Sequence, residues 1–380
     1  MVRRCPEIWQ IPTPSAKLGL TVFGLQNIVF DYQKCDCTFF QKRCCSMLRR
    51  TETPLGFWLL SVVVMAAGGC GQPSSTLSKT KAGSQSGPEK IVTTCGMVTD
   101  IVKIVVGSGK YDVVGLMGEG VDPHLYKPTS NDVRQLLRAD VVIYSGLLLE
   151  GRMSERFKQV AKTGKDVFAV TDGIDRQYLR EPPEFKGHFD PHVWMDVSAW
   201  MHGVEFVAAS MGKIDPANAE TYLANATAYC QALEELDAYV HESIGSIPSE
   251  QRILVTAHDA FGYFGRAYDI EVRSVQGLST ASEAAVQDIN NLVDLIVDRK
   301  IGAIFVESSV SAKNITAIIE GAKRRGWALR IGGELFSDAM GKPGTYEGTY
   351  IGMIDHNVTV ITRALGGTAP EVGLHARLGQ

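Results

Sequence analysis

Short runs of β-branched residues alternate with helical stretches twice along this chain, and a long segment without Gly or Pro separates the two series. The first series predicts strands at 90–94, 112–116, 141–144 and 167–170, with helices at 97–106, 131–139 and 154–163. The second predicts strands at 253–256, 271–275, 303–306 and 328–331, with helices at 283–299, 312–325 and 346–365. Such alternation favours mostly parallel sheets covered by helices on both faces.

The separating segment, 216–244, begins at a Pro and is rich in Ala, Leu, Glu and Tyr. A helix of this length would extend about 40 Å, which is the width of a domain. We therefore predict an α/β fold with two lobes, 89–215 and 245–380, joined by one long rigid helix over 216–244. Thr280 and Glu283 have the spacing of a capping box, which predicts the start of the first helix of the second lobe.

The first 88 residues show a different pattern. Two arginines after Met47 precede a run of 13 uncharged residues at 55–67, LGFWLLSVVVMAA, which is followed by Gly-Gly-Cys70. A short basic region, an apolar run and small residues are typical of a secretory signal, here 47–69. The run is shorter than the roughly 20 residues that a membrane-spanning helix needs. Cys70 after small residues resembles a bacterial lipobox, which predicts lipidation at Cys70 and a flexible tether over 70–88.

A signal that begins at Met47 makes residues 1–46 an upstream extension that does not belong to the natural protein. The alternative is a Cys-rich metal-binding prefix, although its cysteines lack the paired Cys-x-x-Cys spacing of zinc sites. Without residues 1–69 the formal net charge falls from −4 to −8, which argues against nucleic-acid binding. Cys95 and Cys230 lie in apolar surroundings and are expected to be core thiols; a disulfide between them stays open.

Three of the eight histidines lie in notable segments. His124 in GVDPHLY follows a predicted strand, His192 in DPHVW repeats the Asp-Pro-His triplet, and His258 in TAHDAF ends a predicted strand. Asp338 lies in the glycine-flanked loop GGELFSDAMG after another strand. Loops at the carboxyl ends of strands are where open α/β sheets bind ligands. Three imidazoles and a carboxylate would suit Zn²⁺ or another first-row divalent ion.

The other histidines and the nearby acidic residues are expected to have structural roles. His188 lies close enough to His192 to bind an ion transiently. The carboxylates of Asp259, Glu283 and Glu307 are expected to cap helices or to support the ligands, and Asp122, Asp190 and Asp259 are candidates for fixing the imidazole tautomers. The remaining histidines are His202, His241, His356 and His375.

The order and spacing of these four motifs resemble the metal-receptor (cluster A-I) substrate-binding proteins of bacterial ABC transporters, especially the treponemal TroA type, over about residues 89–365. The resemblance implies two α/β lobes bridged by a rigid helix, with the ion between them. It implies His124 and His192 as ligands from the first lobe, and His258 and Asp338 as ligands from the second. Manganese- and iron-type members usually have Glu in place of His258, and zinc-type members usually carry a long His-rich loop, which this chain lacks.

The resemblance therefore implies a receptor for zinc or manganese that is not an enzyme. Its partners would be a membrane permease and its ATPase, and it would be a monomer, exported and lipid-anchored. The alternatives are a zinc-dependent hydrolase and a surface adhesin. Catalytic zinc usually keeps three protein ligands and an open position, and the sequence contains no His-Glu-x-x-His motif.

Overall fold

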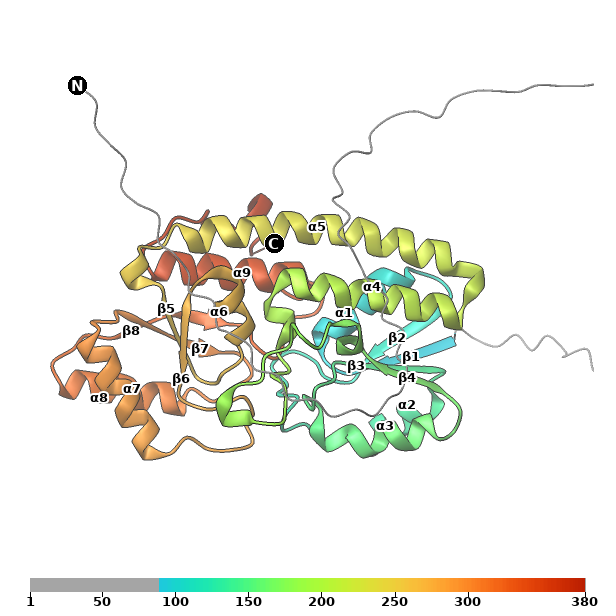
Figure 1. Ribbon diagram of the computed structural model, residues 1–380, viewed down its shortest axis with the longest axis horizontal. Helices are drawn as coiled ribbons and strands as arrows, with labels where there is room; N and C mark the ends of the chain where they lie inside the picture. The colour runs from blue at the N-terminus through green and yellow to red at the C-terminus, as the bar shows by residue number, and fades with distance from the viewer. Residues whose placement is uncertain (1–88, 380) are drawn as a thin grey trace, which may run out of the picture. The chain divides into compact units, whose positions relative to one another are not determined.

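The computed structural model describes residues 89–379, which form two α/β lobes with a long helix packed along both (Figure 1). The upstream extension, the signal, Cys70 and the tether all lie outside the described residues. In the first lobe the strands are β1 (Glu89–Thr93), β2 (Tyr111–Gly115), β3 (Val141–Tyr144) and β4 (Asp166–Ala169). They form one parallel sheet in the order β2-β1-β3-β4. Its helices are α1 (Gly96–Val106), α2 (Ser130–Arg138), α3 (Ser154–Ala161) and α4 (Val197–Ile214).

The second lobe repeats this arrangement. Its strands are β5 (Ile253–Thr256), β6 (Glu271–Ser274), β7 (Ala303–Glu307) and β8 (Arg330–Leu335). Two parallel pairs form, β5 with β6 and β7 with β8, and β5 lies beside β7. The spatial order β6-β5-β7-β8 therefore matches that of the first lobe, although the sequence shows no fixed-period repeat. Its helices are α6 (Gly262–Tyr268), α7 (Val286–Asp298), α8 (Lys313–Arg324) and α9 (Tyr350–Ala364).

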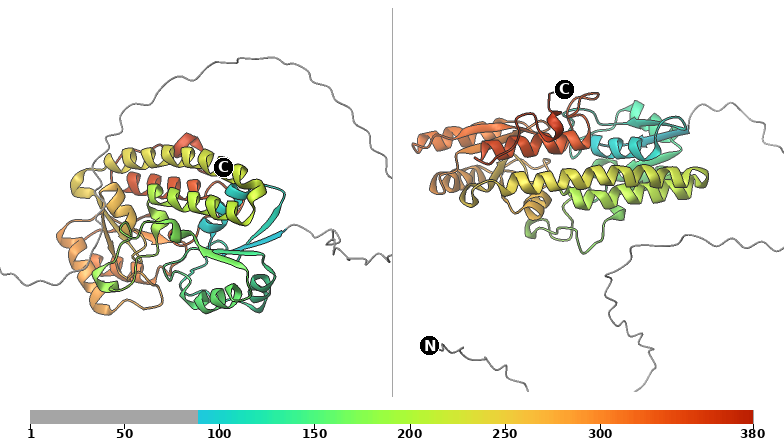
Figure 2. Two further views of the ribbon diagram at one scale, coloured as in Figure 1. Left: turned by 45° about the vertical axis from the view of Figure 1, so that its right-hand side comes forward. Right: turned by 90° about the horizontal axis from the view of Figure 1, so that it is seen from above.

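Helix α5 (Ala219–Gly245) is the element that both lobes share. It packs against α1 and α4 of the first lobe and against α6 and α9 of the second, and Figures 1 and 2 show it running along both. A stripe of buried side chains that includes Tyr222, Leu233 and Val240 faces the core. Pro216–Asn218 forms a short 3-10 turn before it, so the α-helix begins three residues later than its Pro suggests. One hydrophobic core continues from the first lobe into the second beneath this helix.

Most expected strands and helices agree with the structure to within one or two residues, but several expectations are wrong. The capping box at Thr280 and Glu283 is wrong, because α7 begins at Val286 and its first turn is held by the Asp288 carboxylate, which accepts the Ala285 N–H at 3.2 Å. Strand β8 ends at Leu335, four residues later than expected, and helix α9 begins at Tyr350, also four residues later than expected. Helices α4 and α6 were not predicted, since Gly203 and Gly265 interrupt their helical pattern.

In residues 89–379 no helix combines the length and the apolar character that crossing a membrane requires. Cys95 and Cys230 are both free thiols, so the disulfide left open above does not form.

Candidate metal centre

Four side chains from four loops meet where the carboxyl ends of the two sheets face each other. His124 follows β2, His192 precedes α4, His258 follows β5 and Asp338 follows β8. One potential ligand atom of each lies within 4.8 Å of the others. The exposed fraction is 8% for His124 and at most 1% for the other three residues. The structure thus brings together the four residues that the sequence pointed to.

The Nε2 atoms of the three imidazoles converge on the Asp338 carboxylate. The distances to its oxygens are 3.5 Å from His124, 3.3 Å from His192 and 3.2 Å from His258. The Nε2 atoms of His124 and His192 lie 3.3 Å apart. Neither Asp338 oxygen nor the Nε2 of His258 makes a well-aligned hydrogen bond, although all three atoms are buried.

Buried polar atoms without partners are costly, and such groups in native structures call for an explanation. Here one ligand atom from each of the four residues surrounds a single point, and their lone pairs could bind a cation there. Imidazole nitrogens and a carboxylate oxygen suit Zn²⁺ and other first-row divalent ions. The donor set therefore fits a bound divalent ion.

His192 is oriented by Asp190, two residues before it. The Asp190 Oδ1 atom accepts the backbone N–H of His192 at 3.0 Å and lies 2.8 Å from its Nδ1. The guanidinium of Arg180 pairs with the other oxygen of Asp190. A carboxylate behind Nδ1 holds the proton there and leaves Nε2 free to bind an ion.

Glu307 does the same for His258 across 49 residues of sequence. Its Oε2 atom lies 2.5 Å from Nδ1 of His258, while its Oε1 atom accepts the backbone N–H groups of Ala257 at 2.7 Å and of His258 at 2.9 Å. Glu307 ends β7, beside β5, so the parallel arrangement delivers its carboxylate to the His258 turn. Asp259, the neighbouring candidate, forms no hydrogen bond or ion pair with the His258 ring.

His124 is held differently. The Asp122 Oδ1 atom accepts its backbone N–H at 2.8 Å and that of Leu125 at 3.3 Å. Within residues 89–379 no side chain forms a hydrogen bond or ion pair with its Nδ1. Asp122 therefore shapes the turn that carries His124 without fixing the tautomer of its ring.

The charges of the cluster set the directions of its pKa shifts. Burial lowers the pKa of His124 to about 4, against the opposing effect of Asp338. For His192 burial again acts downward, but Asp338 and Asp190 outweigh it and raise the pKa to about 9. Burial also acts to lower the pKa of His258, but Glu307 and Asp338 outweigh burial and raise this pKa well above its usual value. Burial would raise the pKa of Asp338, but the two imidazoles beside it hold it well below its usual range.

His188 lies apart from the cluster, whereas Trp194 packs against it. His188 is exposed and contacts Phe185. The ring of Trp194 is fully buried and stands edge-on to His192, with 5.2 Å between the ring centroids. Its indole N–H donates to the carbonyl of Ser337 at 3.0 Å, next to Asp338, so it links two of the ligand loops.

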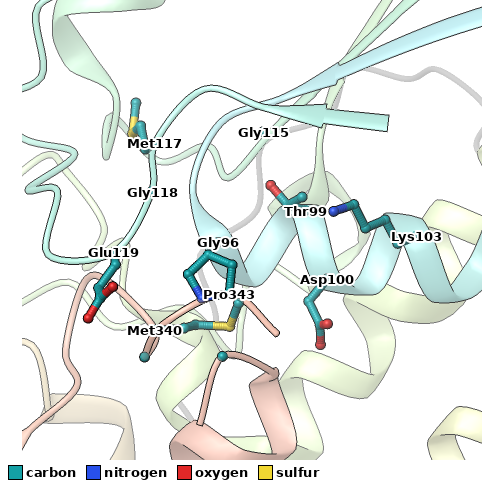
Figure 3. A pocket seen from close by; sticks show the side chains of 12 residues that line it. Gly96, Thr99, Asp100, Lys103, Gly115, Met117, Gly118, Glu119, Met340 and Pro343 are labelled. Atoms are coloured by element: carbon teal, nitrogen blue, oxygen red, sulfur yellow. The ribbon is translucent and has the colours of Figure 1, made fainter. Parts of the chain in front are cut away.

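A second feature near the cluster is a cavity of about 210 Å³ where α1 meets the loop after Asp338 (Figure 3). Met340 and Pro343 approach Gly96 there, and Thr99 and Lys103 line the α1 side. A Cβ atom at Gly96 would lie 3.0 Å from the Met340 Cε atom, so the missing side chain permits this contact between the lobes.

Known proteins share both the sequence and the fold. A profile of the family described as Zinc-uptake complex component A periplasmic (ZnuA) matches residues 91–364. The zinc-binding protein TroA of Treponema pallidum (strain Nichols) is 46% identical over 288 residues, which cover 75% of this chain and 91% of that protein. The manganese-binding lipoprotein MntA of Bacillus subtilis (strain 168) is 44% identical over 298 residues, covering 78% of this chain and 94% of the relative.

Among solved structures, the periplasmic zinc-binding protein TroA from Treponema pallidum superimposes with a TM-score of 0.71 at 47% identity. The match covers 73% of this chain and 99% of the solved one. Both the two-lobed arrangement and the long helix thus have a counterpart of known structure.

Proposed function

Because the chain belongs to the ZnuA family of periplasmic zinc-uptake components, we propose that it is the substrate-binding protein of a metal ABC transporter. Its cargo is a divalent ion, zinc or manganese, bound one per chain by His124, His192, His258 and Asp338. The observation that carries the proposal is the buried convergence of these four side chains, with Asp338 oxygens that accept no hydrogen bond at its centre.

The ligand set is compatible with both ions. Four protein ligands in tetrahedral arrangement favour Zn²⁺, whereas a bidentate Asp338 would supply the additional oxygen that Mn²⁺ prefers. A site with these ligand types binds Mn²⁺ more weakly than Zn²⁺. The relatives named for zinc and for manganese are almost equally similar to this chain, so their names do not favour either ion. Metal supply outside the cell then decides which ion is carried.

The ion serves as a clamp, since its ligands come from loops of both lobes. Helix α5 packs along both lobes and limits their relative motion. Delivery requires a partner that loosens some of the ligands, and the partners we propose are the membrane permease of the transporter and its ATPase. The receptor acts as a monomer in this scheme.

We further propose that the protein is exported and anchored by a lipid on Cys70. One acyl chain binds a membrane only marginally at about 0.8 kcal/mol per buried CH₂, whereas two or more hold stably. Replacing Cys70 by Ala should release the protein from the membrane fraction. Unchanged fractionation of this variant would refute lipidation at this residue.

The ZnuA family is a family of transport receptors, and we propose no catalytic role for this chain. A catalytic zinc site keeps a coordination position for water, whereas four protein ligands fill a tetrahedral site. The adhesin alternative has no separate support in the described residues.

The decisive experiment titrates metal-stripped protein, residues 71–380, with Zn²⁺ and with Mn²⁺ by calorimetry. One ion bound tightly per chain, with the affinity reduced at least about 100-fold in Asp338→Ala, is the expected result, because that variant removes the only anionic ligand. An exposed carboxylate variant, Glu155→Gln, is the control. Absence of tight binding of either ion would overturn the proposed function and leave only the fold.

A further inference from the structure

The segment that carries His192 is fastened to the second lobe by hydrogen bonds on both sides of the ligand. The Tyr263 hydroxyl donates to the carbonyl of Asp190 at 3.0 Å, and the Tyr350 hydroxyl donates to the carbonyl of Trp194 at 2.7 Å. The Trp194 indole donates to Ser337, as described above, and the backbone N–H of Val197 donates to the Tyr268 hydroxyl at 3.2 Å. His192 is therefore fixed to the lobe that also supplies His258 and Asp338.

The loop that carries His124 is fastened much less. Among the described residues, the segment 117–128 makes one hydrogen bond to residues 245–379. In that bond the Thr280 hydroxyl donates to Oδ2 of Asp122 at 2.5 Å, while Oδ1 of the same carboxylate holds the His124 turn. One carboxylate thus shapes the turn and ties it to the opposite lobe.

Thr280 lies in a loop that is itself fixed to the His258 turn. The backbone N–H of Gln276 donates to the carbonyl of Ala257 at 3.0 Å, and the N–H of Asp259 donates to the carbonyl of Gly277 at 3.4 Å. The Asp122–Thr280 bond therefore connects the turns of His124 and His258 through the protein, independently of an ion.

This bond borders a groove of about 540 Å³ that Leu125, Glu283 and Lys313 also line. His124 is the only one of the four ligands with a noticeable exposed fraction. A further contact between the lobes, Met340 against Gly96 (Figure 3), is apolar and imposes no orientation on His124.

We propose that Asp122 and Thr280 form a latch between the lobes that sets how fast the bound ion is released, by holding the His124 turn against a three-ligand unit of His192, His258 and Asp338. This inference rests on the proposed function, since it concerns the same site. Opening the cleft breaks the latch and withdraws His124, while the other three ligands stay together. Asp122 and Thr280 are positioning residues, since neither touches the ion.

The test measures ion dissociation from the full chain by mixing the zinc-loaded protein with an excess of a fluorescent chelator. A hydrogen bond to a charged group corresponds to a change of about tenfold or more in an equilibrium constant. Thr280→Val should therefore accelerate dissociation about tenfold and leave the association rate within about threefold of wild type. Thr280→Ser keeps the hydroxyl and should stay within about threefold of wild type in both rates.

Two further variants separate the latch from a general disturbance of the loop. Ser279→Ala removes a neighbouring hydroxyl that contacts only its own loop, at the N–H of Ala281, and should behave as wild type. Asp122→Ala should accelerate dissociation at least as much as Thr280→Val, and adding Thr280→Val to it should change nothing further.

Wild-type dissociation from Thr280→Val, or additive effects of the two variants, would overturn the latch while leaving the receptor function intact. Failure of the wild-type protein to bind zinc in the same series would instead overturn the proposed function.

Discussion

The carboxylate of Glu307 gives a sharp test of how the site is organised, because it accepts three N–H groups at once. Two are the backbone N–H groups of Ala257 and His258, on Oε1, and the third is Nδ1–H of His258, on Oε2. The side chain is completely buried, so no water substitutes for a lost acceptor. Glu307→Gln keeps the shape but leaves one acceptor oxygen in place of two.

In either orientation of the introduced amide, the hydrogen bonds on one of its two sides are lost: those from the backbone N–H groups or the one from Nδ1 of His258. If its oxygen faces the backbone, its NH₂ group meets Nδ1 of His258 and favours the tautomer with the proton on Nε2, where the ion must bind. If the oxygen faces Nδ1, the NH₂ group opposes two backbone donors. Either outcome removes a charge-assisted hydrogen bond of about 1.5–3 kcal/mol. Loss of a carboxylate behind a metal-binding His typically weakens metal binding 10- to 100-fold.

We therefore expect Glu307→Gln to weaken zinc binding by about 10- to 100-fold, measured by competition with a chelator of known affinity. The control is Glu155→Gln, which removes an exposed carboxylate paired with Lys158. Near-ultraviolet circular dichroism of both metal-free variants checks that the fold is retained. Wild-type affinity in Glu307→Gln would refute the argument that this carboxylate fixes the tautomer of His258.

Three other predictions follow from the same geometry. A Cβ atom at Gly262 would overlap Nη1 of Arg180, so Gly262→Ala should displace the guanidinium from Asp190 and weaken zinc binding several-fold. Gly245→Ala, where nothing lies within 4 Å, should not. Because the pKa of His192 is raised to about 9, its proton competes with the ion, and the affinity should rise by about tenfold per pH unit between pH 6 and 8 for each proton displaced. In the metal-free protein the raised pKa of His192 stabilises the fold. This contribution is fully present below about pH 6.5 and is lost as the pH rises through 9. Measurements of zinc affinity and of the free energy of unfolding over a pH series test both directions. Zinc at about 1,000 times its dissociation constant should add about 4 kcal/mol of stability. That gain corresponds to a rise of about 7 °C in the unfolding midpoint of a chain of this size, which a chelator should reverse.

The sequence predicted the strands well because a buried parallel strand is marked by a short run of β-branched residues, as at Val141–Tyr144. The sequence also identified the four candidate ligands, since His258 and Asp338 follow predicted strands and His124 and His192 share the Asp-Pro-His triplet. It missed α6, a helix of seven residues with a glycine in its middle, because such a segment has too few turns to display a helical period.

What the sequence did not reveal is which side chains meet across the lobes. Thr280 and Glu283 fit a capping box by spacing, yet the Thr280 hydroxyl bonds Asp122, 158 residues away. Asp190 was a candidate partner for His192, and the structure places it there, two residues away. The partner of His258 is Glu307 rather than the adjacent Asp259, because strand pairing, which spacing does not encode, delivers it.

The supporting groups also change the charge of the site. Three neutral imidazoles and Asp338 around a divalent ion would leave one net positive charge in a buried position, which is costly. Asp190 and Glu307 add two negative charges, and the guanidinium of Arg180 beside Asp190 adds one positive charge. With the divalent ion bound these charges sum to zero, whereas a monovalent ion leaves a net negative charge and a trivalent ion a net positive one. Since a buried unbalanced charge is disfavoured in either sign, we expect the carboxylates behind the imidazoles to favour a divalent ion as well as to orient its ligands. This charge balance does not discriminate between two divalent ions, so the choice between zinc and manganese is left to metal supply, as proposed above.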